Sequence, residues 1–209
     1  MCTFQLTEEI IYYADIVYLM NVGLIEKVRT GYYHWIDPNN QSEAATVIKL
    51  FLDGILCMDT ALRHYGSSDR IPAQWHIAVS KYSSRTRFKL EYPFVKPYFV
   101  TPEVFEIGLC EQEFDGNKVK MYDKEWVICD CLRHHNKMDK ETFNKAIQSY
   151  VSDTSKSIPK LMKNSVTLKC QKLVKDLIGV WLRATDKATS VLAAFLSGGV
   201  FAQAVCFSI

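Results

Sequence analysis

The sequence lacks a strong excess of charge of either sign. Its 25 Lys and Arg residues nearly balance 23 Asp and Glu residues, so the formal net charge at pH 7 is only +2. Proteins that bind polyanions over much of their surface are strongly basic, and this chain has no such global signature. Any contact with phosphates must therefore come from local groups of cations.

Paired cysteines and a recognisable secretory leader are also missing. The seven cysteines are scattered, and none forms a C-x-x-C pair. Residues 1–5 lack the basic segment that opens a signal peptide, and no long apolar run follows them. Unpaired cysteines are typical of a reducing compartment, where they behave as small apolar residues. We therefore expect a cytoplasmic protein.

Several signatures of enzymes are absent as well. The chain contains no phosphate-binding loop, no Ser-His-Asp order and no glycine-rich nucleotide fingerprint. Its 209 residues, 48% of them hydrophobic, suit a globular protein of one or two domains. We therefore expect no catalytic residue, no cofactor and no bound metal.

A helix followed by a basic hairpin is predicted at the start of the chain. The helix should span residues 7–21, with Gly23 as its left-handed cap. Strands 24–28 and 32–36 flank a turn in which Gly31 can take a positive φ. The helix's apolar face is expected to contain Ile10, Ile11, Ala14, Val17, Tyr18 and, at its end, Asn21 or Val22.

This order is that of a recognition helix and its wing in a winged helix-turn-helix. Such a helix lies in the major groove, and the tip of the hairpin contacts neighbouring phosphates. Lys27 and Arg29 would be the cations of the tip, with the Thr30 hydroxyl beside them. A packing module without DNA contact is the alternative.

A second group of cations lies in residues 81–100, where five Lys and Arg residues stand against Glu91 alone. The run K-Y-S-S-R-T-R-F-K-L at 81–90 also contains aromatic residues, which suits phosphate contact and stacking on bases. A solvated loop is the alternative. The candidate contacts in this loop are Lys81, Arg85, Arg87 and Lys89.

The remaining pattern predicts an α+β protein: a partial winged helix-turn-helix, then a mixed α/β domain whose C-terminal half is helical. Before residue 123 we expect helices over 42–53 and 56–65, strands over 75–80 and 93–100, and a hairpin over 109–122. Asp123 and Asp139 should cap later helices, followed by helices over 157–164 and 166–183. The expected domains are 1–70, 71–187 and an apolar tail over 188–209.

Two groups of residues suggest other chemistry. Cys129, Asp130, Cys131, His134 and His135 crowd one helix, but a closed zinc site needs four converging ligands and buried cysteines are the simpler interpretation. Carboxylates and lysines alternate on the 109–122 hairpin, as in metal-dependent nucleases or on an exposed strand edge. They are Glu111, Glu113, Asp115, Lys118 and Lys120. A nucleic-acid-processing nuclease is therefore the alternative function.

The tail contains 22 consecutive residues without charge, nearly enough for a membrane span. Its paired glycines and polar residues lower its hydrophobicity. An extension packed on the protein is favoured over a membrane anchor, so no membrane contact is expected.

Specific stretches resemble the AbiEi family of antitoxins. They are the wing L-I-E-K-V-R-T-G-Y-Y, the helix end A-L-R-H-Y-G, the strand W-H-I-A-V-S-K and the later segment Y-D-x-E-x-x-I-C-D-x-L-R-x-x-N-K. The resemblance covers roughly residues 8–182. About six residues precede the recognition helix, which opens with Glu8 and Glu9, so the winged helix looks truncated.

The resemblance implies the antitoxin of a type IV toxin-antitoxin or abortive-infection system. Such a protein represses its own promoter at inverted repeats and antagonises a nucleotidyltransferase-like toxin without needing a stable complex. Carried onto this sequence, the family pattern assigns DNA contact to Tyr12, Tyr13, Lys27, Arg29, Thr30 and Tyr32. It assigns the antitoxin segment to Asp123, Glu125, Asp130 and Arg133.

Overall fold

The structure, a computed structural model, describes residues 11–36, 43–90 and 92–179. Its contacts divide the chain into two compact units. The first contains residues up to 65 together with 69–123, and the second contains residues 66–68 and the chain from 124 onward. The boundary expected after residue 70 does not coincide with this division, because segments before residue 65 share a sheet with strands after residue 75.

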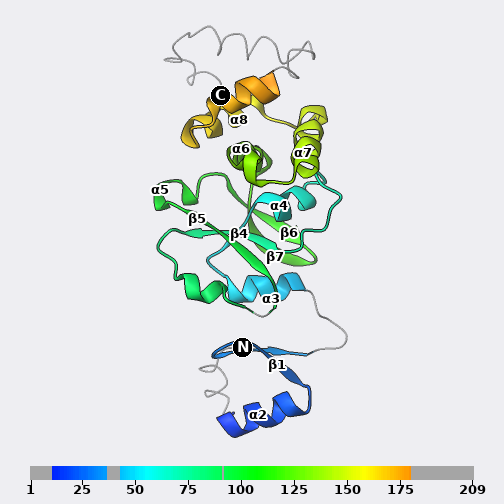
Figure 1. Cartoon of the computed structure of the whole chain (residues 1–209), viewed down its shortest axis with the longest axis vertical. Coiled ribbons are helices and arrows are strands. Elements are labelled where there is room, and N and C mark those ends of the chain that lie inside the picture. Colours follow the sequence, from blue (N-terminus) through cyan, green and yellow to red (C-terminus); the bar gives the residue numbers. More distant parts are fainter. Residues whose placement is uncertain (1–10, 37–42, 91, 180–209) are drawn as a thin grey trace, which may run out of the picture. The chain divides into compact units, whose positions relative to one another are not determined.

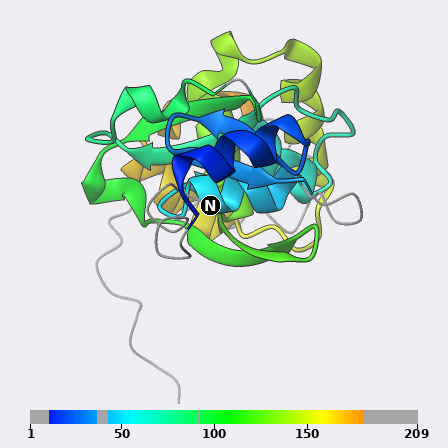
Figure 2. The same ribbon diagram turned by 90° about the horizontal axis from the view of Figure 1, so that it is seen from below.

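The described part of the chain begins with a short helix packed against a hairpin (Figures 1 and 2). Helix α2 spans Tyr13–Asn21, and strands β1 and β2 span Ile25–Arg29 and Tyr32–Trp35. The strands are antiparallel, with Arg29 opposite Tyr32. Both turn glycines take the expected left-handed conformation, with φ of +74° at Gly23 and +79° at Gly31. The predicted helix and hairpin are therefore confirmed.

The start of α2 and its buried face differ from the prediction. Residues 11 and 12 are not helical, and residues 7–10 lie outside the described part of the chain. Ile16 is the buried residue of the helix and packs with Ile25 of β1, whereas Val17 and Tyr18 are 38% and 65% exposed. This short helix is apolar on both sides, so spacing alone could not show which side the hairpin covers.

The first unit is built on a five-stranded mixed sheet in the order β5-β4-β3-β7-β6. Its strands are β3 (Ile55–Leu56), β4 (Trp75–Ser80), β5 (Val95–Val100), β6 (Leu109–Phe114) and β7 (Asn117–Tyr122). Strand β5 lies at an edge, as Pro97 within it and Pro93 just before it predict. The central β3 was not predicted, since Ile55 lay between two expected helices and Leu56 was expected to begin the second one. Two residues are too short a strand to show an alternating pattern.

Helices α3 (Glu43–Leu50) and α4 (Met58–His64) cover opposite faces of this sheet (Figure 1). The His76 side chain meets α4, because its Nδ1 atom accepts the Asp59 N–H over 3.3 Å. The next residue, Ile77, lies against Gly54, just after α3. Because successive side chains of a strand point to opposite faces, the two helices lie on different sides of β4. The short segments η1 (Arg85–Phe88) and α5 (Pro102–Phe105) complete this unit.

The β6–β7 hairpin agrees with the sequence. Asp115 and Gly116 take positive φ angles of +47° and +73°, which a two-residue primed turn requires. The resulting register pairs Glu111 with Lys120 and Glu113 with Lys118.

The second unit is helical. It contains α6 (Lys124–His134), η2 (His135–Lys137), α7 (Lys140–Ser152), α8 (Ile158–Thr167), α9 (Gln171–Leu173) and η3 (Val174–Ile178). Helix α6 packs against α7 and α8 and is buried from Glu125 to Leu132. The Asp139 carboxylate accepts the Thr142 N–H over 3.0 Å, so it caps α7 as predicted. Together the two units confirm the α+β class.

No helix within the described ranges is both long enough and apolar enough to cross a membrane. The predicted tail, residues 188–209, lies outside those ranges.

Substitution of Gly54 tests the packing between α3 and the sheet. A Cβ atom built there would lie 2.5 Å from the Ile77 Cγ2 atom and 3.0 Å from the Phe51 carbonyl oxygen. We expect Gly54→Ala to lower the free energy of unfolding by about 1–3 kcal/mol, measured by urea denaturation. In an Ile77→Ala background the same substitution should cost less. An equal cost in both backgrounds would contradict this packing.

Candidate functional site

The structure brings the wing, the β1–β2 hairpin, and the cationic loop together within the first unit. A hollow of about 590 Å³ is lined by wing residues and loop residues that are some fifty positions apart in the sequence. We call it the wing–loop hollow, and its lining residues are Lys27, Val28, Thr30, Tyr32, Ser84, Thr86, Arg87 and Lys89. Five of the ten predicted DNA contacts therefore line one concave surface.

Arg87 anchors the loop side of this hollow. Its guanidinium donates two hydrogen bonds to the Asp53 carboxylate, at 2.6 and 2.8 Å. The same guanidinium lies 5.2 Å from the ring centre of Phe51 and 5.6 Å from that of Phe88. These two rings stack in parallel with their centres 5.2 Å apart. The short helix η1 is thereby held against the end of α3.

This pairing changes the role of Arg87. The hydrogen bonds from Arg87 hold the pKa of the Asp53 carboxyl below its usual value, and the charges of Arg87 and Lys120 lower it further. Much of the Arg87 charge is therefore balanced by the neighbouring Asp53 carboxylate. The other cations that line the hollow are Lys27 and Lys89. Because Asp53 balances much of the Arg87 charge, we expect these two to dominate the attraction of the hollow for an anion.

Four other predicted DNA contacts are not among the residues that line the hollow. The Lys81 ammonium lies 5.5 Å from the Tyr82 ring centre, and the Arg85 guanidinium lies 5.3 Å from that of Phe99. Tyr12 and Tyr13 stand at the start of α2 and are 64% and 75% exposed. Arg29 is at the end of β1, and its side chain lies outside the described part of the structure.

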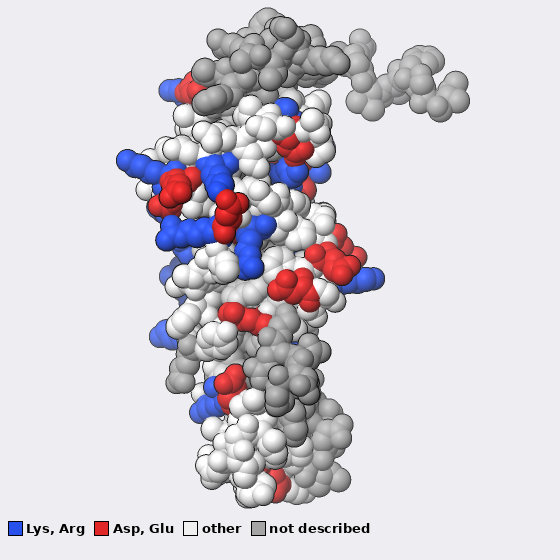
Figure 3. Space-filling view, turned by 90° about the vertical axis from the view of Figure 1, so that its right-hand side faces the viewer, with Lys and Arg blue, Asp and Glu red and all other residues white. Residues whose placement is uncertain are grey.

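Charges of both signs are interspersed elsewhere. On the face in Figure 3, the described Lys and Arg side chains lie beside Asp and Glu side chains and form no broad field of one sign. This distribution agrees with the net charge of +2. Attraction for polyanions therefore depends on local geometry.

The predicted antitoxin segment is mostly interior. Asp123, Glu125 and Asp130 are all less than 10% exposed, so their side chains cannot form much of a docking surface. The Glu125 carboxylate accepts the Ser157 N–H over 2.9 Å, at the start of α8. These residues therefore build the helical unit.

Asp130 and Arg133 form a pair along α6. The Arg133 guanidinium donates to the Asp130 carboxylate over 3.2 Å, as their spacing predicts. Burial raises the pKa of Asp130, and the charge of Arg133 opposes that rise. The Arg133 side chain is 42% exposed, so it is the residue of this segment that a partner could reach.

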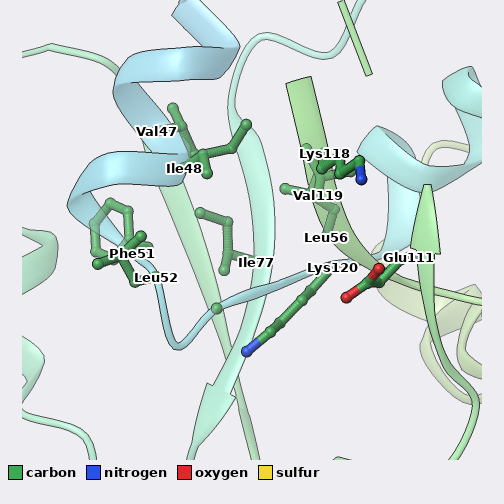
Figure 4. Close-up of a pocket in the computed structure, with 11 residues that line it drawn as sticks. Val47, Ile48, Phe51, Leu52, Leu56, Ile77, Glu111, Lys118, Val119 and Lys120 are labelled. Atoms are coloured by element: carbon green, nitrogen blue, oxygen red, sulfur yellow. The ribbon is translucent and has the colours of Figure 1, made fainter. Parts of the chain in front are cut away.

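A second, smaller pocket borders the alternative nuclease hairpin (Figure 4). It has a volume of about 190 Å³ and lies between α3 and the sheet, with an apolar lining that includes Phe51 and Ile77. Glu111 and Lys120 stand at its edge, on neighbouring strands. Among the described residues, no three His, Cys, Asp or Glu side chains are grouped as a metal site requires.

Sequence reasoning missed three contributors to the wing–loop hollow. Ser84 and Thr86 line it, and their hydroxyls hydrogen-bond to each other over 2.8 Å, which leaves one hydroxyl hydrogen to donate. Their position within a basic run was a usable signal, because hydroxyls commonly accompany cations at phosphates. Asp53 was also missed, since nothing local indicates that a carboxylate 34 residues before Arg87 pairs with it.

The Arg87–Asp53 pair can be tested by its pH dependence. The depressed pKa of Asp53 means that the pair stabilises the fold above the carboxyl's unfolded pKa and that this stability is lost as pH falls through the folded value. Asp53→Asn should lower the free energy of unfolding at pH 7 by up to about 1 kcal/mol, given the partial exposure of the pair, and by less at pH 3. Asp115→Asn at the hairpin turn is the matched control. A penalty for Asp53→Asn that does not change with pH would contradict the ion pair.

Comparison with known proteins does not extend the resemblance. No family model matches the chain, and no curated protein matches it significantly. The similarity of residues 8–182 to AbiEi antitoxins therefore stays a prediction. Function has to be argued from the geometry of the wing–loop hollow and from the residues that line it.

Proposed function

We propose that the protein is a DNA-binding antitoxin of AbiEi type, which represses its own promoter and antagonises a nucleotidyltransferase-like toxin. The observation that carries the DNA-binding part is the wing–loop hollow. Cations and hydroxyls from two distant segments line one concave surface there. Phosphodiester backbones are bound by this combination of Lys or Arg with Ser, Thr and Tyr hydroxyls.

The electrostatics of the hollow support backbone contact over base reading. Asp53 partly neutralises Arg87, so Lys27 and Lys89 supply most of the attraction. Helix α2 contains no Lys or Arg and carries Asp15 in its first turn. A helix of this composition gains little from the phosphates that flank a major groove. In the proposed complex, α2 contributes exposed aromatic groups and the hollow supplies affinity.

The antitoxin part of the proposal is supported by the family resemblance. The segment that carries it, from Tyr122 to Lys137, forms α6 and its flanks, and α6 is the buried helix around which α7 and α8 pack. The segment therefore maintains the helical unit. We expect toxin antagonism to depend on exposed residues of this unit, among them Arg133.

The salt dependence of promoter binding tests the role of the hollow. Each phosphate contact that is lost should reduce the slope of log K against log salt by about 0.9. Lys27→Ala with Lys89→Ala should therefore reduce the slope by about two units in titrations of promoter duplex at several salt concentrations. Lys118→Ala with Lys140→Ala, at exposed positions that do not line the hollow, is the matched control. An unchanged slope in the first variant would place the contacts elsewhere.

Co-expression with the toxin encoded by the neighbouring gene tests the second activity. The Lys27→Ala and Lys89→Ala variant should lose promoter repression in a reporter assay and still restore growth, because the proposed antitoxin unit is unchanged. Arg133→Ala should show the opposite pattern. Loss of both activities in both folded variants would contradict this division of labour.

A further inference from the structure

A third pocket in the first unit combines aromatic walls with hydrogen-bonding groups. Its volume is about 190 Å³. Four aromatic side chains line it, together with polar side chains from α3, α4 and the segment before β4. We call it the aromatic pocket, and the residues that define it are Trp75, Tyr92, Phe94, Phe114, Glu43 and Arg63.

Two of the four aromatic side chains are held by ring contacts within the protein, and the other two are exposed to solvent. The Trp75 and Phe114 rings meet edge to face with their centres 5.5 Å apart, and Phe114 also stacks on His64. The Tyr92 and Phe94 rings form a second pair and are 51% and 54% exposed. Ring faces of this kind bind planar aromatic groups by stacking.

The polar groups provide both an acceptor and a donor. The Glu43 carboxylate accepts the Trp75 indole N–H over 2.8 Å, which fixes its orientation. Partial burial raises the pKa of the Tyr92 hydroxyl, and a hydrogen bond with Glu43 raises it further. A carboxylate has about four acceptor positions, so positions remain for a ligand. The Arg63 guanidinium supplies donors only.

We propose that the aromatic pocket binds a purine base and that guanine fits it best. Guanine carries adjacent N–H donors that suit the Glu43 carboxylate, and its O6 and N7 atoms accept hydrogen bonds from a guanidinium such as Arg63. Adenine presents a ring acceptor where guanine presents a donor, so the carboxylate disfavours it. A cationic ligand is disfavoured by Arg63. This site shares no residue with the wing–loop hollow, and it extends the proposed function.

The size of the aromatic pocket limits what enters it. Pockets for drug-sized ligands measure about 300–1,000 Å³. A pocket of about 190 Å³ holds one base and leaves the attached sugar and phosphate outside. The base can therefore come from a free nucleotide or from an unpaired position of a nucleic-acid strand, because both present the same ring.

Calorimetric titration of the full chain with mononucleotides tests the proposal. GMP should bind at least tenfold more tightly than AMP or UMP. Glu43→Gln should remove most of the preference for GMP, since an amide loses one of the two acceptors. Phe94→Ala should weaken GMP and AMP by a similar factor of about five or more, because it removes a stacking surface. Glu141→Gln and Tyr82→Ala, both outside the pocket, are the matched controls.

Titrations with an RNA tetranucleotide and with choline test where the base comes from and whether the pocket prefers a base to a cation. A guanine-containing RNA tetranucleotide that binds more tightly than GMP assigns the site to an unpaired strand position, and equal affinities assign it to free nucleotides. Choline binding in place of GMP would overturn the proposal in favour of a cation site. Absence of GMP binding by the folded chain would overturn it, as would GMP affinity unchanged in folded Glu43→Gln and Phe94→Ala. The Lys27→Ala and Lys89→Ala variant should bind GMP normally, which separates this site from promoter binding.

Discussion

The interaction between Arg87 and Asp53 determines where the cationic loop lies. Two hydrogen bonds and two aromatic rings hold one guanidinium at the end of α3. Because η1 is fixed in this way, the hydroxyls of Ser84 and Thr86 and the ammonium of Lys89 face the same hollow as the wing. The candidate DNA-binding surface therefore depends on a partly exposed ion pair, and this pair balances the charge of Arg87, one of the predicted DNA-binding cations.

Because the net charge is low, the proposed DNA binding by this protein depends on where its few available cations lie. A strongly basic protein can bind DNA through many interchangeable cations, but acidic and basic side chains are interspersed here (Figure 3). A few positioned groups must then supply both affinity and orientation. In the second unit, Glu125 and Asp130 are likewise buried and make contacts within the unit, whereas Arg133 stays accessible.

Local sequence signals predicted the parts of the fold that depend on local conformation. Gly31 and the Asp115-Gly116 pair marked both hairpins because few residues adopt a positive φ, and Asp139 marked a helix start. Strand β3 was not predicted because it has only two residues, and its strand conformation depends on pairing with β4 and β7. The covered side of α2 depends equally on where the hairpin packs.

The candidate sites show the same limit. The cations of the loop and wing were predictable from composition, but Asp53 and Glu43 gain their roles through contacts with residues 34 and 32 positions away. The predicted antitoxin segment was correctly placed at a helix, yet its acidic residues are buried, which a motif cannot show. Long-range pairing is decided by packing of the whole unit.

Hydrogen exchange of the full chain with and without its promoter duplex tests the central claim most directly. If the wing and the cationic loop bind one stretch of phosphates, the amides of residues 25–35 and 81–90 should gain protection together, at the same DNA concentration. The β6–β7 hairpin tip at Asp115 and Gly116 should be unaffected. Protection of one segment without the other, or of neither, would contradict a shared surface.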